Sequence, residues 1–302
     1  MRIIFMGTPD FAVPSLKILV ENNLNVVAVI TAPDKPKGRG KKLGTSAVKD
    51  YATSVGLTVL QPTNLKDGTF QDQLRSLKAD LQVIVAFRML PEAVWSMPTI
   101  GSINLHGSLL PQYRGAAPIN WAIMNGEKET GVTTFFLQHE IDTGKIIFQE
   151  REPILPEDNV GSVYSRLMHK GAELVLKTVK AIENNDYPQI DQREDQELIS
   201  APKIFRATCE IDWNQNVERV LNHIRGLSPY PAAWTTWNER TIKVFKASES
   251  KTSADKEVGQ IWTEAKIHLF AQCADGTIAL EEVQLEGKKR MKTADLLRGM
   301  QL

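Results

Sequence analysis

The first half of this chain alternates short apolar runs with segments whose apolar residues recur at helical spacing, and this alternation constrains the fold more than any other feature. Residues 3–6, 25–31 and 81–87 are apolar runs of the length of buried strands. Residues 46–55 have helical spacing, and Ser46 is placed to cap that helix. Alternating strands and helices predict βαβ units and a parallel sheet. The same patterns predict further strands over 57–60, 132–137 and 146–154, and helices over 10–22, 71–77, 119–124 and 160–184.

The composition and the periodicity of the sequence change near residue 186. Residues 186–206 are polar and irregular and contain Pro188 and Pro202, which is typical of a linker. A helix is predicted over 216–225, followed by short strands over 233–237, 241–246, 267–272 and 277–285. Short strands separated by turns predict a small antiparallel β domain of barrel type.

The chain is therefore expected to have two domains, in line with its 302 residues. The expected boundaries are an α/β domain over 1–189, a linker over 190–208 and a β-barrel domain over 209–302.

Composition excludes several classes of protein. The 36 basic and 36 acidic residues balance, so a nucleic-acid site has to be a local patch. The two cysteines, Cys209 and Cys273, form neither a disulfide framework nor a zinc or redox spacing. The apolar run at residues 3–6 is too short for a signal peptide, and no run reaches transmembrane length. We therefore expect a cytoplasmic protein with no metal and no membrane partner.

The segment 102–111 carries the chemistry that the sequence shows best. Asn104 and His106 alternate on one face of a predicted strand, and a glycine ends that strand. Asp142 lies in a separate turn, Ile-Asp-Thr-Gly at 141–144. An amide that holds an oxyanion, an imidazole that moves protons and a carboxylate suit acyl transfer. Taken singly, Asn104 and His106 are also compatible with a strand cap and a structural histidine.

Two strand ends suggest a slot for a flat ligand. Segments 87–91 and 106–111 both follow strands, where ligands bind in open α/β sheets. The alternative is that Met89, Leu109 and Leu110 simply cover the core. Residues 7–14 lack the G-x-G-x-x-G fingerprint, which argues against a nicotinamide cofactor.

Basic residues gather in two places. Residues 35–42 form a basic, glycine-rich loop, to which Lys49 adds a further charge, and 288–290 with Lys292 and Arg298 form a second cluster. A charge run is usually a solvated surface, but two clusters in separate domains of a neutral protein suggest one extended polyanion.

With these motifs in place, the chain closely resembles the methionyl-tRNA formyltransferase family over nearly its full length. The segments that carry the resemblance are 6–14, 38–43, 104–111, 113–118, 141–144, 201–203, 211–213, 224–225, 229–231, 242–244 and 283–291. The Asn-x-His and Asp-Thr-Gly pair is specific for folate-dependent formyltransferases in general. The basic loop and the C-terminal run narrow the resemblance to the family that acts on tRNA.

The resemblance implies a Rossmann-like, mostly parallel sheet domain followed by an oligonucleotide-binding-type β-barrel that binds tRNA. It implies transfer of a formyl group from 10-formyltetrahydrofolate to methionyl initiator tRNA in translation initiation, by a monomer without a metal. The implied catalytic residues are Asn104, His106 and Asp142. The implied folate-binding residues are Phe87, Met89, Ser108, Leu109, Leu110 and Pro111, and the implied tRNA-binding residues are Arg39, Lys41, Lys42, Lys288, Lys289 and Arg290.

The chain departs from the family pattern in two places. The family commonly has an aromatic residue followed by glycine after the fourth strand, whereas Phe87 is followed here by Arg88 and Met89. Their bulk is expected to narrow or reshape the pterin edge. Residues 138–140 are Gln-His-Glu, whereas the family is expected to have a glycine in this segment. This difference is expected to alter the conformation of the loop before Asp142.

Three alternative functions are compatible with parts of these observations. A formyltransferase for amino sugars or nucleotides has the same catalytic core, although the basic loop and the barrel argue against it. A formyltetrahydrofolate hydrolase uses water in place of the amine. A non-enzymatic tRNA-binding module leaves the arrangement of Asn104, His106 and Asp142 unexplained.

Overall fold

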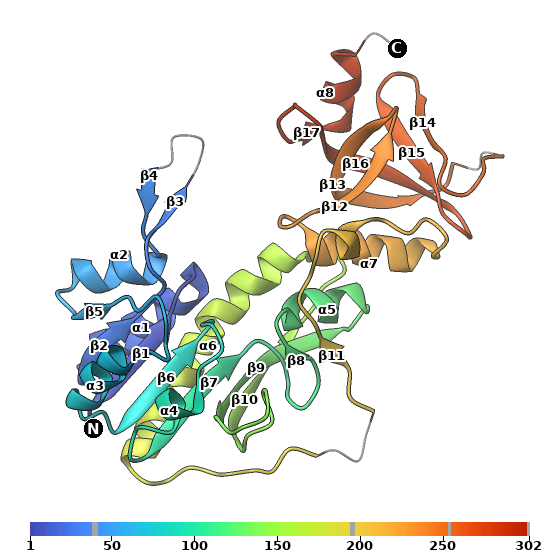
Figure 1. The fold of residues 1–302 in the computed structure, drawn as a ribbon. Coiled ribbons are helices and arrows are strands. Elements are labelled where there is room, and N and C mark those ends of the chain that lie inside the picture. The colour runs from blue at the N-terminus through green and yellow to red at the C-terminus, as the bar shows by residue number, and fades with distance from the viewer. Residues whose placement is uncertain (38–41, 194–196, 253–254, 301–302) are drawn as a thin grey trace. The chain divides into compact units, whose positions relative to one another are not determined.

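The computed structural model describes residues 1–37, 42–193, 197–252 and 255–300 (Figure 1). The chain divides into two compact units. Unit 1 comprises residues 1–115, 131–152 and 164–200, and unit 2 comprises 116–130, 153–163 and 201–302. Each unit has its own sheet, as the two predicted sheet types require.

Unit 1 contains a seven-stranded sheet in the order β10-β9-β7-β6-β1-β2-β5. Strand β1 pairs in parallel with β2 and β6, β6 with β7, and β2 with β5, whereas β9 runs antiparallel to β7. The predicted Rossmann-like, mostly parallel sheet is therefore confirmed. The strands are β1 (Ile3–Gly7), β2 (Val26–Ile30), β5 (Val59–Leu60), β6 (Leu81–Val85), β7 (Gly101–His106), β9 (Glu129–Phe136) and β10 (Ile146–Pro153).

The helices of unit 1 begin where polar side chains cap them. The Ser46 side chain accepts a hydrogen bond from the Lys49 backbone N–H, as the predicted cap requires. Asp67 caps the next helix in the same way, so that helix begins before the predicted residue 71. The helices are η1 (Asp10–Ala12), α1 (Val13–Glu21), α2 (Ala47–Ser54), α3 (Gly68–Ser76), α4 (Glu92–Trp95) and α6 (Val160–Glu183).

Helix α6 packs closely against β7 in the centre of the sheet. Gly171 permits this approach, because a Cβ atom there would lie 2.6 Å from Leu105 Cδ2. Ile103 and Leu105 are buried on the face of β7 that α6 covers. The opposite face of β7 is thereby left for Asn104 and His106.

The predicted basic loop is held by a short β-hairpin. Strands β3 (Lys35–Lys37) and β4 (Lys42–Gly44) pair antiparallel on either side of residues 38–41. At the base of the hairpin the Lys49 Nζ–Asp34 Oδ2 distance is 2.5 Å. Lys49, grouped with the loop by sequence, is therefore neutralised by Asp34.

Unit 2 is built on a curled antiparallel sheet in the order β12-β13-β16-β15-β14, with β17 beside β16 (Figure 1). This confirms the predicted small β domain of barrel type. Strand β14 (Ile261–Glu264) and helix α8 (Thr293–Arg298) were not predicted. The other strands are β12 (Ala233–Trp237), β13 (Arg240–Ser250), β15 (His268–Gln272), β16 (Thr277–Leu285) and β17 (Met291–Lys292).

Helices α5 (Pro118–Met124) and α7 (Val217–Leu227) pack together within unit 2. A Cβ atom at Gly226 would lie 2.5 Å from Met124 Cγ, and the Asn120 Nδ2 donates to the Gly226 carbonyl over 2.8 Å. This packing groups residues 116–130 with unit 2. The short strands β8 (Arg114–Gly115) and β11 (Ser200–Ala201) lie where the chain leaves unit 1.

Candidate active site

Asn104 and His106 lie on the same face of β7, as the strand period predicts. Asn104 is opposite Ile84 in β6 and Phe135 in β9, and His106 is opposite Thr133. His106 is buried, whereas Asn104 is half-buried. Among the described residues none hydrogen-bonds to the Asn104 amide, so this donor is available to a ligand.

The two nitrogens of His106 have different neighbours. Nε2 lies 2.9 Å from the Tyr113 carbonyl oxygen. Because a carbonyl only accepts hydrogen bonds, this contact places a proton on Nε2. Nδ1 faces the Asp142 carboxylate, with 3.7 Å between Nδ1 and Oδ2. This distance is too long for a direct hydrogen bond.

The Asp142 carboxylate is held by the backbone of the segment after Tyr113. The Gly115 N–H donates to Asp142 Oδ2 over 2.9 Å. Asp142 itself has a positive φ of 57°, and its side chain is 11% exposed. The turn needs Gly144, because a Cβ there would lie 1.6 Å from the Phe136 carbonyl oxygen. The Asp-Thr-Gly turn thus points a carboxylate at an imidazole that comes from a different strand.

Together the three side chains form an arrangement suited to acyl transfer. The Asn104 amide offers an N–H to a developing oxyanion. The gap between His106 Nδ1 and Asp142 Oδ2 leaves both groups with capacity to bind an attacking N–H group. The structure brings Asn104, His106 and Asp142 to one edge of the sheet, although they are separated by up to 38 positions in the sequence.

The predicted folate residues follow the two neighbouring strands β6 and β7. Met89 is 75% exposed, and Phe87 is half-buried against the core. Thr133 Oγ1 donates to the Ser108 carbonyl over 2.6 Å and accepts from the Leu110 N–H over 3.2 Å. The main chain at 108–110 is therefore already fixed by the protein. Leu109 and Pro111 are half-buried, and Ser108 and Leu110 are buried.

The predicted tRNA residues lie in both units. Arg39 and Lys41 fall outside the described residues, and Lys42 begins β4 with a side chain that is likewise outside them. Lys288, Lys289 and Arg290 are exposed in the turn between β16 and β17.

Arg290 differs from its two lysine neighbours. It donates to both Glu282 carboxylate oxygens, over 2.8 Å from Nε and 2.6 Å from Nη2. Its guanidinium also lies 4.3 Å from the centre of the Phe245 ring. These contacts fix Arg290 and leave Lys288 and Lys289 as the more available charges of this turn.

Comparison with known proteins agrees with this geometry. A family model described as formyl transferase matches residues 1–179, and one described as formyl transferase, C-terminal domain, matches 203–301. A methionyl-tRNA formyltransferase of Bacteroides thetaiotaomicron is 54% identical over 100% of this chain and 96% of its own length. The chain belongs to the methionyl-tRNA formyltransferase family. A relative of the same name from Flavobacterium johnsoniae is 48% identical, over 99% of this chain and 96% of its own.

Solved structures share the fold at lower identity. An N-formyltransferase from Helicobacter canadensis, in complex with folinic acid and dTDP-3-aminofucose, has a TM-score of 0.68 and 21% identity, covering 92% of this chain and 98% of that one. HypX from Aquifex aeolicus, in complex with tetrahydrofolic acid, has a TM-score of 0.68 and 19% identity, covering 98% of this chain and 47% of that one. The fold of this chain is thus shared with an N-formyltransferase and with HypX.

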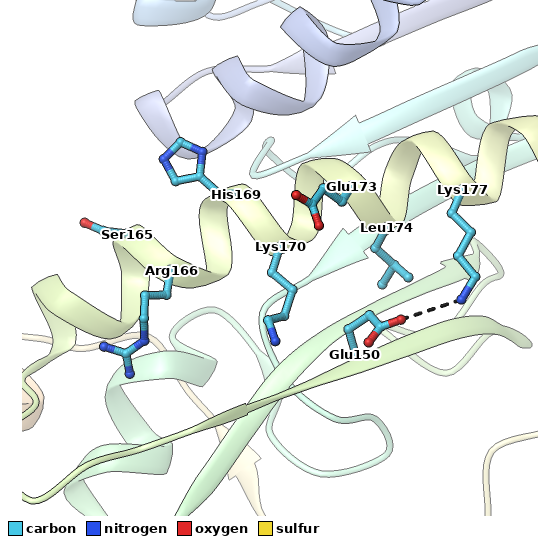
Figure 2. A pocket seen from close by; sticks show the side chains of 8 residues that line it. All are labelled: Glu150, Ser165, Arg166, His169, Lys170, Glu173, Leu174 and Lys177. Carbon is cyan, nitrogen blue, oxygen red and sulfur yellow. Dashed lines mark ion pairs between the residues drawn. The ribbon is translucent and has the colours of Figure 1, made fainter.

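A groove of about 720 Å³ on unit 1 lies away from the residues of the methionyl-tRNA formyltransferase motifs. Figure 2 shows Arg166, Lys170 and Lys177 pointing from α6 toward the strands. The three cations meet carboxylates on β10, because Arg166 and Lys170 both contact Glu152, and Lys177 lies 3.6 Å from Glu150. The groove therefore carries little net charge.

The described residues contain neither a cluster of metal ligands nor a helix suited to a membrane. No group of three or more His, Cys, Asp or Glu side chains among them is arranged to hold a metal ion. None of the helices in the described ranges is long and apolar enough to cross a membrane.

Sequence reasoning missed the residues that hold the loop of Asp142. Gln192 Nε2 donates to the carbonyls of Asp142 and Gly144, each over 2.8 Å, and Arg114 donates to Gln192 Oε1. Gln192 lies in the segment predicted as a linker, and no local pattern marks it. Tyr113 and Gly115 lie within the family motif 113–118, which was the signal available for them.

Proposed function

We propose that this chain transfers the formyl group of 10-formyltetrahydrofolate to the free amino group of methionyl initiator tRNA, which yields formylmethionyl-tRNA for translation initiation. The observation that carries this proposal is the 54% identity to a methionyl-tRNA formyltransferase over the whole chain. The grouping of Asn104, His106 and Asp142 at one sheet edge supports it, because formyl transfer needs an oxyanion donor and a group that takes up a proton.

The reaction forms a bond between the α-amino nitrogen and the formyl carbon and breaks the bond from that carbon to the folate nitrogen. An α-amino group titrates around pH 7.7–8.0, and an esterified one lower, so a large neutral fraction is present at neutral pH. Asn104, and His106 when it is protonated, stabilise the oxyanion that develops when the amine attacks. Asp142 orients His106 and accepts the amine proton, directly or through water, and the leaving folate nitrogen is reprotonated.

The two substrates are assigned to different sets of residues. Phe87, Met89 and the segment 108–111 are the residues proposed to hold the folate, whose flat pterin suits a slot with apolar walls. The basic hairpin at 35–44 and the turn at 288–290 are proposed to bind tRNA phosphates. We place the reaction in the cytoplasm, where translation begins, and propose that the protein acts as a monomer without a metal.

Formation of formylmethionyl-tRNA from 10-formyltetrahydrofolate by the purified protein tests this function. An Asp142→Asn variant, which keeps the shape of the side chain but removes its charge, is expected to lose at least about 100-fold in kcat. Asp72→Asn is a matched control, because Asp72 is an exposed residue that pairs with Arg75 on α3.

The possible outcomes separate the alternatives. Transfer by wild type and Asp72→Asn but not by Asp142→Asn supports both the substrates and the role of Asp142. Folate turnover without an acceptor would identify a hydrolase. Transfer to a nucleotide-linked amino sugar, with no tRNA product, would overturn the proposed acceptor.

A further inference from the structure

Arg88 joins two loops at the carboxyl edge of the sheet in unit 1. It follows β6, and its side chain reaches the segment after β5. The guanidinium Nη1 donates to the Thr63 carbonyl over 3.0 Å, and Nη2 donates to the neighbouring Pro62 carbonyl. Because β1 and β2 lie between β6 and β5 in the sheet order, this contact spans the ends of two strands.

The segment that Arg88 reaches is itself fixed to the protein. Gln61 Nε2 donates to the Ala32 carbonyl and to Asp34 Oδ1, each over 2.8 Å. Asp34 is held in turn by Lys49 on α2, and these contacts lower the pKa of Asp34. Arg88 is therefore attached to a braced segment rather than to a free loop end.

The charge of Arg88 is used differently from that of Arg75 and Arg166. Arg166 and Arg75 each contact a carboxylate. Within the described part of the chain, no carboxylate lies within ion-pair distance of Arg88. Its guanidinium contacts two neutral carbonyls and lies 5.7 Å from the centre of the Phe87 ring. Loss of water at these contacts lowers the pKa of Arg88, yet the group remains charged.

The backbone near Arg88 needs such support. Ala86 turns the chain after β6 with a positive φ of 48°, a conformation that costs energy for a residue other than glycine. Met89 is 75% exposed, so it contributes little packing to hold the loop. Two hydrogen bonds from a planar cation fix both the position and the direction of the loop that presents Phe87 and Met89.

We propose that Arg88 is a positioning residue for the folate co-substrate: it holds the loop 86–89 against the segment 61–63 so that Phe87 and Met89 form a preorganised wall. This inference rests on the proposed function, since it assumes that the loop borders the folate. Arg88 acts through Phe87 and Met89 and takes no part in proton transfer. Its removal therefore weakens folate binding and leaves the chemical step nearly unchanged.

The test uses Arg88→Met and Arg88→Lys in the full-length chain, with Arg75→Met as a matched control on the exposed face of α3. For Arg88→Met we expect the KM for 10-formyltetrahydrofolate to rise about tenfold, with kcat changed by less than about twofold. Arg88→Lys keeps the charge but offers a single donor nitrogen in place of the guanidinium fork. Its KM is therefore expected to lie between those of wild type and Arg88→Met. Arg75→Met is expected to match wild type.

Equilibrium dialysis with 5-formyltetrahydrofolate, without tRNA, gives a second reading that does not depend on transfer. The Kd of Arg88→Met is expected to rise in parallel with its KM, while its melting temperature stays near that of the Arg75→Met control. If Arg88→Met fails to fold, the Kd of Arg88→Lys relative to wild type decides in its place.

The outcomes separate this inference from the proposed function. An unchanged KM and Kd in folded Arg88→Met, or a loss confined to kcat, would overturn the positioning role even if wild type transfers formyl groups. A wild type that binds the folate but forms no formylmethionyl-tRNA would refute the proposed function, while a raised Kd in Arg88→Met would still support the inference. A wild type that neither transfers nor binds the folate would overturn both.

Discussion

Two clusters of polar side chains in unit 1 differ in how completely the protein satisfies them. At the end of β7, the Asn104 amide has no hydrogen-bond partner among the described residues, and His106 Nδ1 stays 3.7 Å from Asp142. Between α6 and β10, the Glu152 carboxylate contacts Arg166 over 2.5 Å and Lys170 over 3.0 Å. The second cluster also lines the groove of Figure 2, through Arg166 and Lys170.

The difference shows why the groove between α6 and β10 is not the better candidate for chemistry. A group that is already paired has little capacity left for a substrate, whereas an oriented donor without a partner can bind a charge that develops later. This contrast supports the proposed catalysis at the edge of β7 and a structural role for the charges around Glu152. Three predictions test this contrast, beginning with the largest effect.

Asn104→Ala is expected to lower kcat by about 100- to 1,000-fold, because an oxyanion donor acts mainly near the transition state. The KM values for folate and tRNA are expected to change much less. Steady-state kinetics of formyl transfer measure both quantities. A raised KM with an unchanged kcat would make Asn104 a binding residue and would weaken the contrast between the two clusters.

Glu152→Gln is expected to lower the free energy of unfolding by about 1–2 kcal/mol, a range reduced because Arg166 and Lys170 are partly exposed to solvent. Burial favours a raised pKa for Glu152, but hydrogen bonds from Arg166 and Lys170 and their charges lower it overall. The stabilisation is therefore complete above the ordinary pKa of 4.5 and is lost as the pH falls through the lower folded value.

Urea denaturation at pH 7 and at acidic pH measures this loss, and formyl transfer measured alongside should stay within about twofold of wild type. A large fall in kcat at full stability would show that the groove takes part in the reaction. That result would reverse the assignment of the two clusters.

The smallest effect concerns His223 on α7, a histidine whose buried Nε2 has no hydrogen-bond partner. Burial lowers its pKa from the ordinary value of 6.5. The unfolded chain therefore binds a proton near that pH while the folded chain does not, and stability falls as the pH decreases below it. His223→Gln is expected to flatten this fall, by at most about 1.4 kcal/mol per pH unit.

Chemical denaturation of the full chain between about pH 5 and pH 8 checks this, with His268→Gln, a change of an exposed residue at the start of β15, as the control. Activity is expected to stay unchanged in both variants. A pH profile that is identical in wild type and His223→Gln would contradict the prediction. Burial of His223 would then have no measurable effect on how stability depends on pH.

Much of the fold followed from local patterns. The strands over 233–237 and 277–285 were predicted at the bounds that the structure has, because alternating side chains and flanking turns mark them. Strand β14 and helix α8 were missed, since both are short. The predicted domain boundaries at 189 and 209 remain predictions, and α5 groups with α7 through a contact that no local pattern encodes.

The site was predictable in part for the same reason. The prediction that Asn104 and His106 share one face of a strand is confirmed, because side-chain alternation along a strand is a local property. Gln192 and Gly115 were not, because they act on Asp142 from segments distant in the sequence. The contact of Arg88 with Pro62 and Thr63 was also unforeseen, since it depends on the order of the strands in the sheet.

The sequence by itself determined the two sheet types, the strand face that Asn104 and His106 share, and the family. Hydrophobic periodicity, turn chemistry and short motifs are encoded within a few residues of each other. Only the tertiary structure decided which charges are already neutralised, as for Lys49, Arg290 and Glu152. Pairing of this kind joins elements far apart in the chain, so it becomes defined only when packing has set the distance between the groups.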